Sequence, residues 1–545
     1  MQTAAGAPTR LARIAAALPA GLAVGFVLLF VIAPLVAMLR ETVVGPDGFT
    51  LSAWSQVLGS SLDRAQLLRS MELGAASCAL AFVFGFGHAW LTERTDLPLG
   101  AVLGPLGIAP LVVPPILVAM GFADFIDASG FWVCVFLLGT SYAPFVAVMT
   151  ARGLRGIDGR AYEAALVARG RGPAERMLFR TIRPEIAAGL LFAFVFVISE
   201  HGVPEFLTVK GKTWHTYAEG VFARWTRRAT GTTHEELVGP IVTALPLVVV
   251  IVVALLVALR LRAQSELRTD FRPLPQRRLG RWRIPALLLP LTYLACGVGV
   301  PVVVMLRWAL GSTQRIEPMS LDRLRRNFRG AIDQAGDDLA YTILLALCAT
   351  LLLLAVAAPL ARLARNRARG VELVTILPIA VPAILLAIGF VHVFNSRVAG
   401  DLYGNLGFDF YDSMGVVVCA YAARFLPFGV LTLATALRRQ PRALDEATAL
   451  AGRSGLATFL AIRLPLLLPV MGSVACLVFV LALRELDVAV VLPAGNGTVV
   501  RRLSNIVHFG GEDQGGALAL MLLFVACALP LLAVILTGRK LRSLS

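Results

Sequence analysis

Two short groups of ionisable residues lie in stretches that are otherwise apolar. These groups are Glu200, His201 and Glu205, followed much later by Arg484, Glu485 and Asp487. Ionisable side chains at membrane depth are costly, and they usually face an aqueous cavity or a partner. Carboxylates and an imidazole could guide a cation or gate a path. The alternative is structural pairing, for example of Arg484 with Glu485 or Asp487.

The chain offers no constellation for covalent chemistry. Its one Gly-Lys-Thr, Gly211-Lys212-Thr213, has Phe206 where a phosphate-binding loop requires its first Gly. The seven cysteines lie in apolar stretches without a Cys-x-x-Cys pair, which is typical of small core residues. We therefore expect neither an enzyme nor a metal site, and no cofactor bound by this chain.

The elements that position these residues are predicted to be membrane helices. Hydrophobic residues make up 57% of the chain and charged residues 15%, and the mean hydropathy is +0.77. Apolar runs of about 20 residues, enough to cross a bilayer, recur throughout. We predict an all-α, polytopic membrane protein with about twelve spans, at 14–38, 71–91, 100–123, 130–152, 186–208, 238–260, 284–305, 339–362, 371–394, 413–436, 466–487 and 517–538.

The spans form an internal repeat. Residues 108–122 and 376–390 are identical at nine of fifteen positions, and Pro144, Leu154 and Glu163 recur as Pro427, Leu437 and Glu446 at one offset. Six spans in each half make the repeats parallel, related by an axis along the membrane normal. We predict one unit at 1–262, a linker at 263–283 and a second unit at 284–545.

Arginine clusters predict the orientation. The segments 151–185 and 260–283 each carry eight Arg, within a net charge of +16. The positive-inside rule places both clusters, and both termini, in the cytoplasm. The same rule accounts for the positive net charge, so we expect no nucleic-acid partner. The expected partner is the lipid bilayer, which a multi-pass chain crosses repeatedly.

Prolines mark the third span of each half: Pro110, Pro114 and Pro115, then Pro378 and Pro382. Proline removes a helical hydrogen bond and bends the helix. We expect bent third spans, with Pro114 and Pro382 as candidates to line a pathway. A static kink for packing is the alternative.

The segment after each fourth span has a helix–turn–helix pattern. In 438–465, Glu446 and Ala447 precede a turn at Gly452, and Pro465 is expected to end the next helix and open a span. In 151–185 the corresponding residues are Glu163, Ala164 and Ala165, with Gly170 at the turn, Gly172 as a competitor, and Pro184. Ordinary amphipathic connectors are the alternative.

This pattern resembles the cytoplasmic loop of ABC importer permeases. Each half is similar to the six-span unit of the importers for ferric iron, thiamine and 2-aminoethylphosphonate, which are commonly fused, and 198–207 and 483–492 resemble the end of their fifth span. The resemblance implies a type I importer permease in a bacterial inner membrane, with a periplasmic binding protein as partner. It also implies a separate ATPase dimer, which holds ATP and Mg, docked on coupling residues Glu163, Ala164, Ala165, Gly170, Glu446, Ala447 and Gly452.

The substrate and the energy source have alternatives. The Glu/His group favours a cationic or metal-bearing substrate, ferric iron included, and thiamine, 2-aminoethylphosphonate or a polyamine remain open. A transporter driven by an ion gradient would work without an ATPase and would need acidic relays deeper in the membrane. A membrane enzyme or a structural scaffold is the third alternative, and the sequence offers no nucleophile–base or metal constellation in its support.

Overall fold

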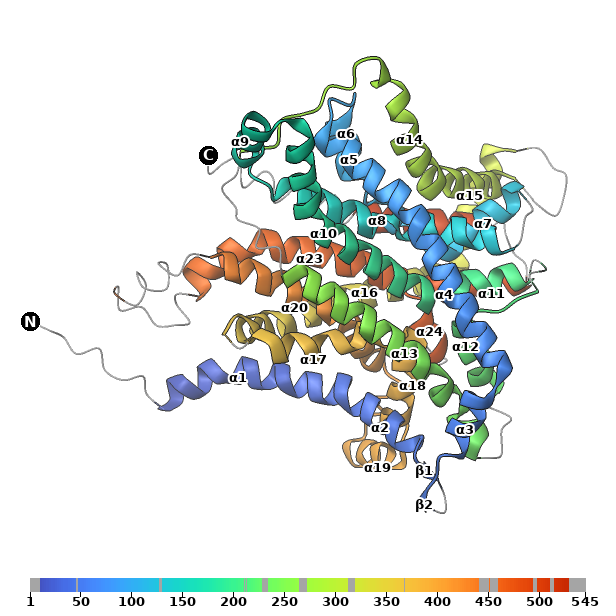
Figure 1. Ribbon diagram of the computed structural model, residues 1–545. Helices are drawn as coiled ribbons and strands as arrows, with labels where there is room; N and C mark the ends of the chain where they lie inside the picture. The colour runs from blue at the N-terminus through green and yellow to red at the C-terminus, as the bar shows by residue number, and fades with distance from the viewer. Residues whose placement is uncertain are drawn as a thin grey trace, which may run out of the picture. The chain divides into compact units, whose positions relative to one another are not determined.

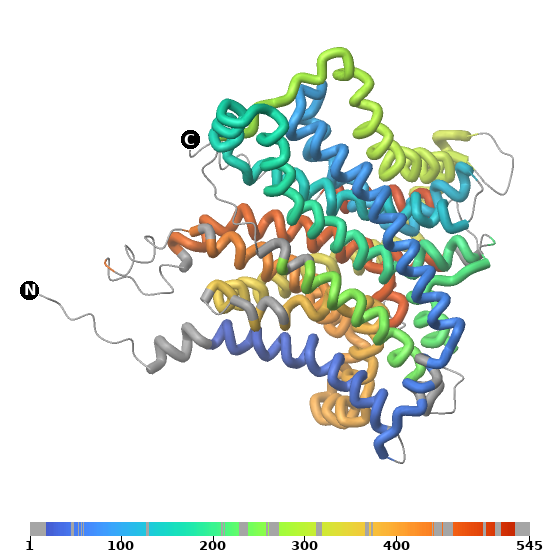
Figure 2. Tube along the Cα trace, viewed as in Figure 1, coloured from blue at the N-terminus to red at the C-terminus, as the bar shows by residue number. Residues whose placement is uncertain are grey.

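The protein is almost entirely helical where its structure is described. The computed structural model describes residues 10–45, 48–126, 130–209, 211, 213–227, 234–263, 272–311, 319–366, 368–440, 450, 459–493, 497–509 and 514–528. Strands β1 (Val44–Gly45) and β2 (Gly48–Phe49) form an antiparallel hairpin within this part. The predicted all-α class is confirmed (Figures 1 and 2).

Eleven membrane spans can be assigned among the described residues. Nine are single helices, and two are pairs of helices joined at a sharp bend. The expected twelfth span, 517–538, is described only as the helix Gln514–Ala528, and its remainder lies outside the described residues. Eleven of the twelve expected spans are therefore assigned among the described residues.

Both third spans are broken at their prolines. Gly100–Leu111 meets Pro115–Ile126 at 95°, and Val374–Ala380 meets Ala383–Phe394 at 111°. Pro114 lies in the first break, and Pro382 directly precedes the helix after the second. The missing N–H of each proline explains why the helical hydrogen bonds stop there.

Contacts divide the chain into two compact units. Unit 2 comprises residues 41–339 and 499–523. Its helices are α3 (Ser52–Gly59), α4 (Ser61–Ala81), α5 (Gly87–Arg94), α6 (Gly100–Leu106), α7 (Pro115–Ile126), α8 (Phe131–Arg155), α9 (Gly159–Arg169), α10 (Arg171–Ser199), α11 (Gly202–Val209), α12 (Tyr217–Arg227), α13 (His234–Ala263), α14 (Leu288–Leu294), α15 (Val300–Leu310), the start of α16 (Leu321–Asn366) and α25 (Val499–Phe509).

Unit 1 comprises residues 1–40, 340–498 and 524–545. Its helices are α1 (Arg10–Val27), α2 (Ala33–Glu41), the rest of α16, α17 (Ala368–Ala380), α18 (Ala383–Phe394), α19 (Arg397–Leu406), α20 (Met414–Arg439), α23 (Leu464–Leu483) and α24 (Asp487–Val491). Single π-helical turns occur at Leu28–Ile32 and Phe459–Arg463 here, and at Phe82–Phe86 and Ala295–Gly299 in unit 2.

Helices α4, α8 and α10 form the core of unit 2. Glycines let them approach closely: an added Cβ at Gly139 of α8 would lie 3.0 Å from the carbonyl oxygen of Ser77 in α4, and one at Gly189 of α10 would lie 2.9 Å from that of Phe145 in α8. Membrane helices commonly associate through such small residues, because dispersion contacts at short range replace the hydrophobic effect. This packing holds α10 firmly against α8.

The first span of each half packs in the unit built mainly from the other half. In unit 1, Gly389 of α18 lies against Pro34 of α2, and Phe30 stacks on Phe394 with centroids 5.4 Å apart. In unit 2, Gly121 of α7 lies against Pro301 of α15. Gly121 and Gly389 are repeat partners. The halves 1–262 and 284–545 therefore do not coincide with the compact units: each half lends its first span, and residues 306–339 and 499–523 of the second half also belong to unit 2.

Three expected helix boundaries are wrong. The expected single spans 186–208 and 466–487 are interrupted, since α10 ends at Ser199 and α11 starts at Gly202, while α23 ends at Leu483 and α24 starts at Asp487. Pro465 ends no helix: the turn Phe459–Arg463 continues directly into α23. The missing N–H of Pro465 falls at the change from the wider turn 459–463 to α23, where the regular i→i−4 pattern is already interrupted.

The Gly–Pro contact is testable. In Gly389→Val, the new Cβ would lie 2.9 Å from the Cβ of Pro34 and 3.0 Å from its carbonyl oxygen. We expect the stability of the purified protein to fall by about 1–3 kcal/mol through overpacking. Thermal unfolding in detergent measures this, with Gly472→Val as control, because nothing lies within 4 Å of that position. Equal unfolding midpoints for the two variants would contradict the contact.

Candidate functional site

Gly170 forms the turn between the first helix of the predicted coupling loop and the next helix. Helix α9 begins after Asp158, whose side chain accepts a hydrogen bond from the backbone N–H of Arg160 at 3.0 Å. It ends at Gly170, where φ is +77° and ψ is 179°. This region of backbone conformation is essentially restricted to glycine. Gly172, the competing glycine, lies inside α10, so the structure assigns the turn to Gly170.

Tyr162 anchors α9 on α10. Its ring is buried, and its hydroxyl donates to Oε1 of Glu175 at 2.9 Å. The guanidinium of Arg94 lies 4.7 Å from the ring centroid and 3.5 Å from the same carboxylate. Burial, together with the hydrogen bond to Glu175, raises the pKa of Tyr162 above its ordinary value, so the phenol stays a donor at neutral pH.

An apolar cluster surrounds this anchor. It joins the end of α8, helix α9 and the start of α10 through Leu154, Ile157, Tyr162, Ala174, Leu178, Ile182 and Ile186. Ala165 packs against the cluster from α9. The helix–turn–helix is consequently a fixed part of unit 2, with one face buried.

The opposite face of α9 is small, apolar and exposed. Ala164, Val167 and Ala168 are exposed at helical spacing, and Val167 is 89% exposed. Glu163, beside them, pairs with Arg272 through Oε2 and Nη1 at 3.2 Å. An exposed apolar patch on a helix suits close approach by another protein. The residues corresponding to these in the second half, Glu446, Ala447 and Gly452, lie outside the described residues.

Helix α10 connects this face to the first ionisable group. Its 29 residues span about 43 Å at 1.5 Å per residue. The helix begins at the Gly170 turn and ends at Glu200, which caps its C-terminus. Pro184 lies inside the helix without ending it. Whatever displaces α9 is therefore linked to Glu200 by one continuous helix.

The fourth span holds the carboxylate of Glu200 at the break between α10 and α11. The hydroxyl of Tyr142, from α8, donates to Oε2 of Glu200 at 2.5 Å. His201 is buried, its Nε2 lies 3.9 Å from Oε2 of Glu205, and its ring lies 4.8 Å from that of Phe222 in α12. The sequence group Glu200, His201 and Glu205 is thus brought together at the α10–α11 break.

The second ionisable group has the same arrangement in unit 1. Oε2 of Glu485 lies 3.0 Å from Nε of Arg424, which comes from α20, the fourth span of the second half. The hydroxyl of Tyr421 donates to the backbone carbonyl of Glu485 at 3.1 Å. Arg484 and Asp487 are both buried. Glu485 is thus paired with the fourth span of its own half through Arg424.

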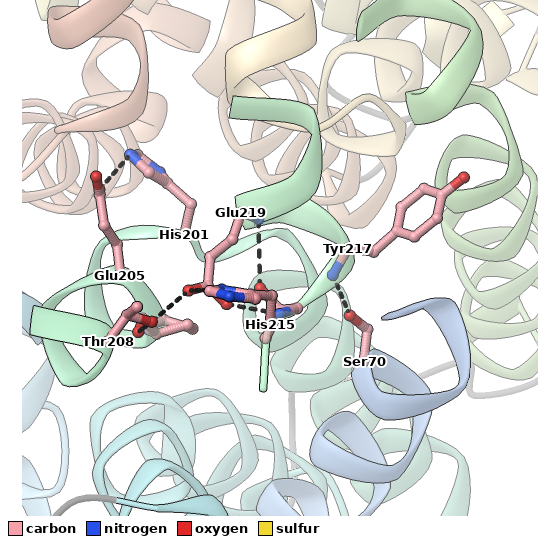
Figure 3. A network of polar contacts seen from close by, with 9 residues as sticks. Ser70, His201, Glu205, Thr208, His215, Tyr217 and Glu219 are labelled. Atoms are coloured by element: carbon pink, nitrogen blue, oxygen red, sulfur yellow. Dashed lines mark hydrogen bonds and ion pairs between the residues drawn. The ribbon is translucent and has the colours of Figure 1, made fainter. Parts of the chain in front are cut away.

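A polar network that sequence reasoning missed fixes α12 to α11 (Figure 3). Oε2 of Glu219 accepts from the backbone N–H of Thr216 at 2.6 Å, and Oε1 accepts from the hydroxyl of Thr208 at 3.0 Å. The backbone N–H of Tyr217 donates to the hydroxyl of Ser70 in α4 at 2.8 Å. The Thr216-x-x-Glu219 spacing is a capping box, and it could have predicted the start of α12.

A comparison with known families gives one match in each half. The family model described as "Binding-protein-dependent transport system inner membrane component" matches residues 89–269 and 352–539, which is more than half of the chain. The first match contains α9 and α10, and the second contains Glu446 and Gly452. A search of curated proteins found no match.

The Gly170 turn predicts different effects for two neighbouring glycines. Gly170→Val should lower stability by about 1–3 kcal/mol, because valine would be forced into a conformation reserved for glycine. Gly172→Val is the control, since nothing lies within 4 Å of Gly172 and its φ is helical. Proteolysis of the 159–175 segment measures the difference. Faster cleavage in Gly172→Val than in Gly170→Val would contradict this assignment and indicate that the turn is at Gly172.

Proposed function

Because the chain belongs to the family of binding-protein-dependent transport system inner membrane components, we propose that it forms the translocation pathway of an ABC importer and couples it to a separate ATPase. The family is a transporter membrane component and not an enzyme. The observation that carries the proposal is the family match in both halves, with α9 presenting an exposed face next to a glycine turn.

The coupling residues are proposed to dock on the ATPase dimer. In half one, Glu163 and Ala164 lie at the exposed face of α9, Ala165 packs beneath it against the apolar cluster, and Gly170 ends the helix. Glu446, Ala447 and Gly452 would form the counterpart in half two. ATP binding closes the ATPases, draws the coupling helices together and rocks the halves to open outward, and hydrolysis resets them. The free energy enters as a biased conformational equilibrium. ATP and Mg stay on the partner, and this chain binds no cofactor itself.

The proposed orientation follows from the arginine clusters. The α9 end, which lies next to Arg152, Arg155 and Arg160, faces the cytoplasm together with both termini. The α11–α12 end of unit 2 then faces the periplasm of a bacterial inner membrane, where a substrate-binding protein docks. This placement is supported by the separation of the two ends along α10.

The proposed substrate is cationic or metal-bearing, with ferric iron as the first candidate. Its support is the charge at the fifth-span breaks, where Glu200, His201 and Glu205 in unit 2 correspond to Arg484 and Glu485 in unit 1. Pro114 and Pro382, at the broken third spans, are proposed to line the same pathway. Thiamine, 2-aminoethylphosphonate and a polyamine are the other candidates.

Purification from the native membrane tests both levels of this proposal. The tagged chain is captured in mild detergent, and co-purifying proteins and bound small molecules are identified by mass spectrometry. We expect an ATPase and a binding protein that carries the substrate. Purification without an ATPase, under conditions that retain other membrane complexes, would contradict the proposed function.

The exposed face of α9 predicts a local effect on docking. Val167→Asp should reduce binding of the co-purifying ATPase at least about tenfold, since it places a charge in an apolar interface without disturbing the buried face of α9. Val398→Asp is the matched control, because Val398 is 80% exposed on α19. A binding titration of the ATPase against each variant in nanodiscs measures the two affinities. An ATPase affinity equal in the two variants would show that α9 is not the docking face.

A further inference from the structure

The segment Arg272–Arg283, here called the strap, connects the two halves and lies against α9. The backbone N–H of Gly159, the first residue of α9, donates to the carbonyl oxygen of Arg272 at 2.8 Å. A Cβ at Gly159 would lie 2.5 Å from the carbonyl oxygen of Pro273. The side chain of Arg272 then pairs with Glu163 one helical turn further along. The strap thus touches α9 through main-chain and side-chain atoms.

The strap also pairs with the loop that follows α5. The N–H of Arg277 donates to the carbonyl oxygen of Arg94 at 2.7 Å, and the N–H of Asp96 donates back to that of Arg277 at 3.1 Å. Oδ1 of Asp96 accepts from the N–H of Leu279 at 2.8 Å. Arg283 donates through Nε to the carbonyl oxygen of Asp96 at 2.9 Å. Asp96 is therefore bonded to three residues of the strap.

Two further contacts join the strap to the Tyr162 anchor. Leu274 packs against the apolar cluster that contains Tyr162. The guanidinium of Arg94 donates to the carbonyl oxygen of Pro275 while it lies over the Tyr162 ring and beside Glu175. One arginine therefore contacts the strap, α9 and α10 together.

These contacts exceed what a tether needs. A linker that only joins two halves needs enough length to span the distance between them, and a flexible segment without fixed contacts is sufficient for that. The strap instead accepts a backbone hydrogen bond from α9 at Arg272, exchanges a pair of backbone hydrogen bonds at Arg277, and contributes the apolar side chain of Leu274 to a core. Ordering these residues costs conformational entropy, which the contacts must offset.

On the basis of the proposed function, we propose that the strap positions α9 for the ATPase, so that the first coupling helix is preorganised before its partner binds. The strap also lies beside Glu163 at the edge of the docking face, where Arg272 is exposed. The ATPase subunit at half one therefore meets a composite surface of α9 and strap. Preorganisation raises affinity by removing the cost of ordering at the moment of binding.

Asp96 provides the sharpest test, because it is a positioning residue outside α9. Asp96→Ala removes the acceptor for Leu279, and we expect about three- to tenfold weaker ATPase binding. Asp96→Asn keeps an acceptor oxygen and should stay within about twofold of the native chain. Arg278→Ala, a neighbouring exposed arginine of the strap, is the control and should also bind normally.

Hydrogen exchange of the full chain in nanodiscs supplies a readout that needs no partner. In Asp96→Ala and in Gly159→Val, amides of 159–169 and 272–279 should exchange faster, while those in the middle of α10 keep their rates. Unchanged exchange in 159–169 would overturn the positioning role, even if the strap itself loosens. Unaltered ATPase binding despite a loosened α9 would overturn it as well.

The two proposals fail separately. If the native chain binds no ATPase, the proposed function falls, and the exchange of 159–169 still shows whether the strap orders α9. If the native chain binds an ATPase and Asp96→Ala binds equally well, the strap is a tether and only the further inference falls.

Discussion

The continuity of α10 is the constraint on which the functional geometry depends. Its 29 residues run without a break from the Gly170 turn to Glu200, and both of its ends are held. At one end Tyr162 bonds to Glu175, and at the other Tyr142 bonds to Glu200. A continuous helix whose side is packed on α8 moves as a unit. In the proposed function, a displacement of α9 is therefore transmitted to the break in the fifth span.

The ionisable groups at the breaks are paired within their own units. Arg424 with Glu485, and Tyr142 with Glu200, join the end of the fifth span to the fourth span. Removing one partner of a buried charge pair is costly, so these contacts hold one arrangement until another offers equivalent partners. If the proposed transport pathway is gated here, such pairing gives the gate discrete positions, which suits a switch between two conformations better than gradual opening.

The sequence was sufficient for the class, the repeat and the broken third spans, because hydropathy, internal identity and proline chemistry are local signals. Hydropathy does not predict the interruption at Glu200, since apolar residues continue on both sides of it. The exchange of first spans depends on tertiary contacts such as Gly389 with Pro34. The choice of Gly170 over Gly172 needed the backbone angles. Arg-rich composition indicated a solvated linker and gave no sign of its contacts with α9.

In the proposed function, a partner ATPase drives the conformational cycle through α9. Uptake into liposomes containing the chain, its co-purifying ATPase and the loaded binding protein tests this most directly, with ionophores added to abolish ion gradients. We expect substrate to accumulate in proportion to ATP hydrolysed, with no effect of the ionophores. Accumulation without ATP that ionophores abolish would contradict it, and would instead establish a gradient-driven carrier.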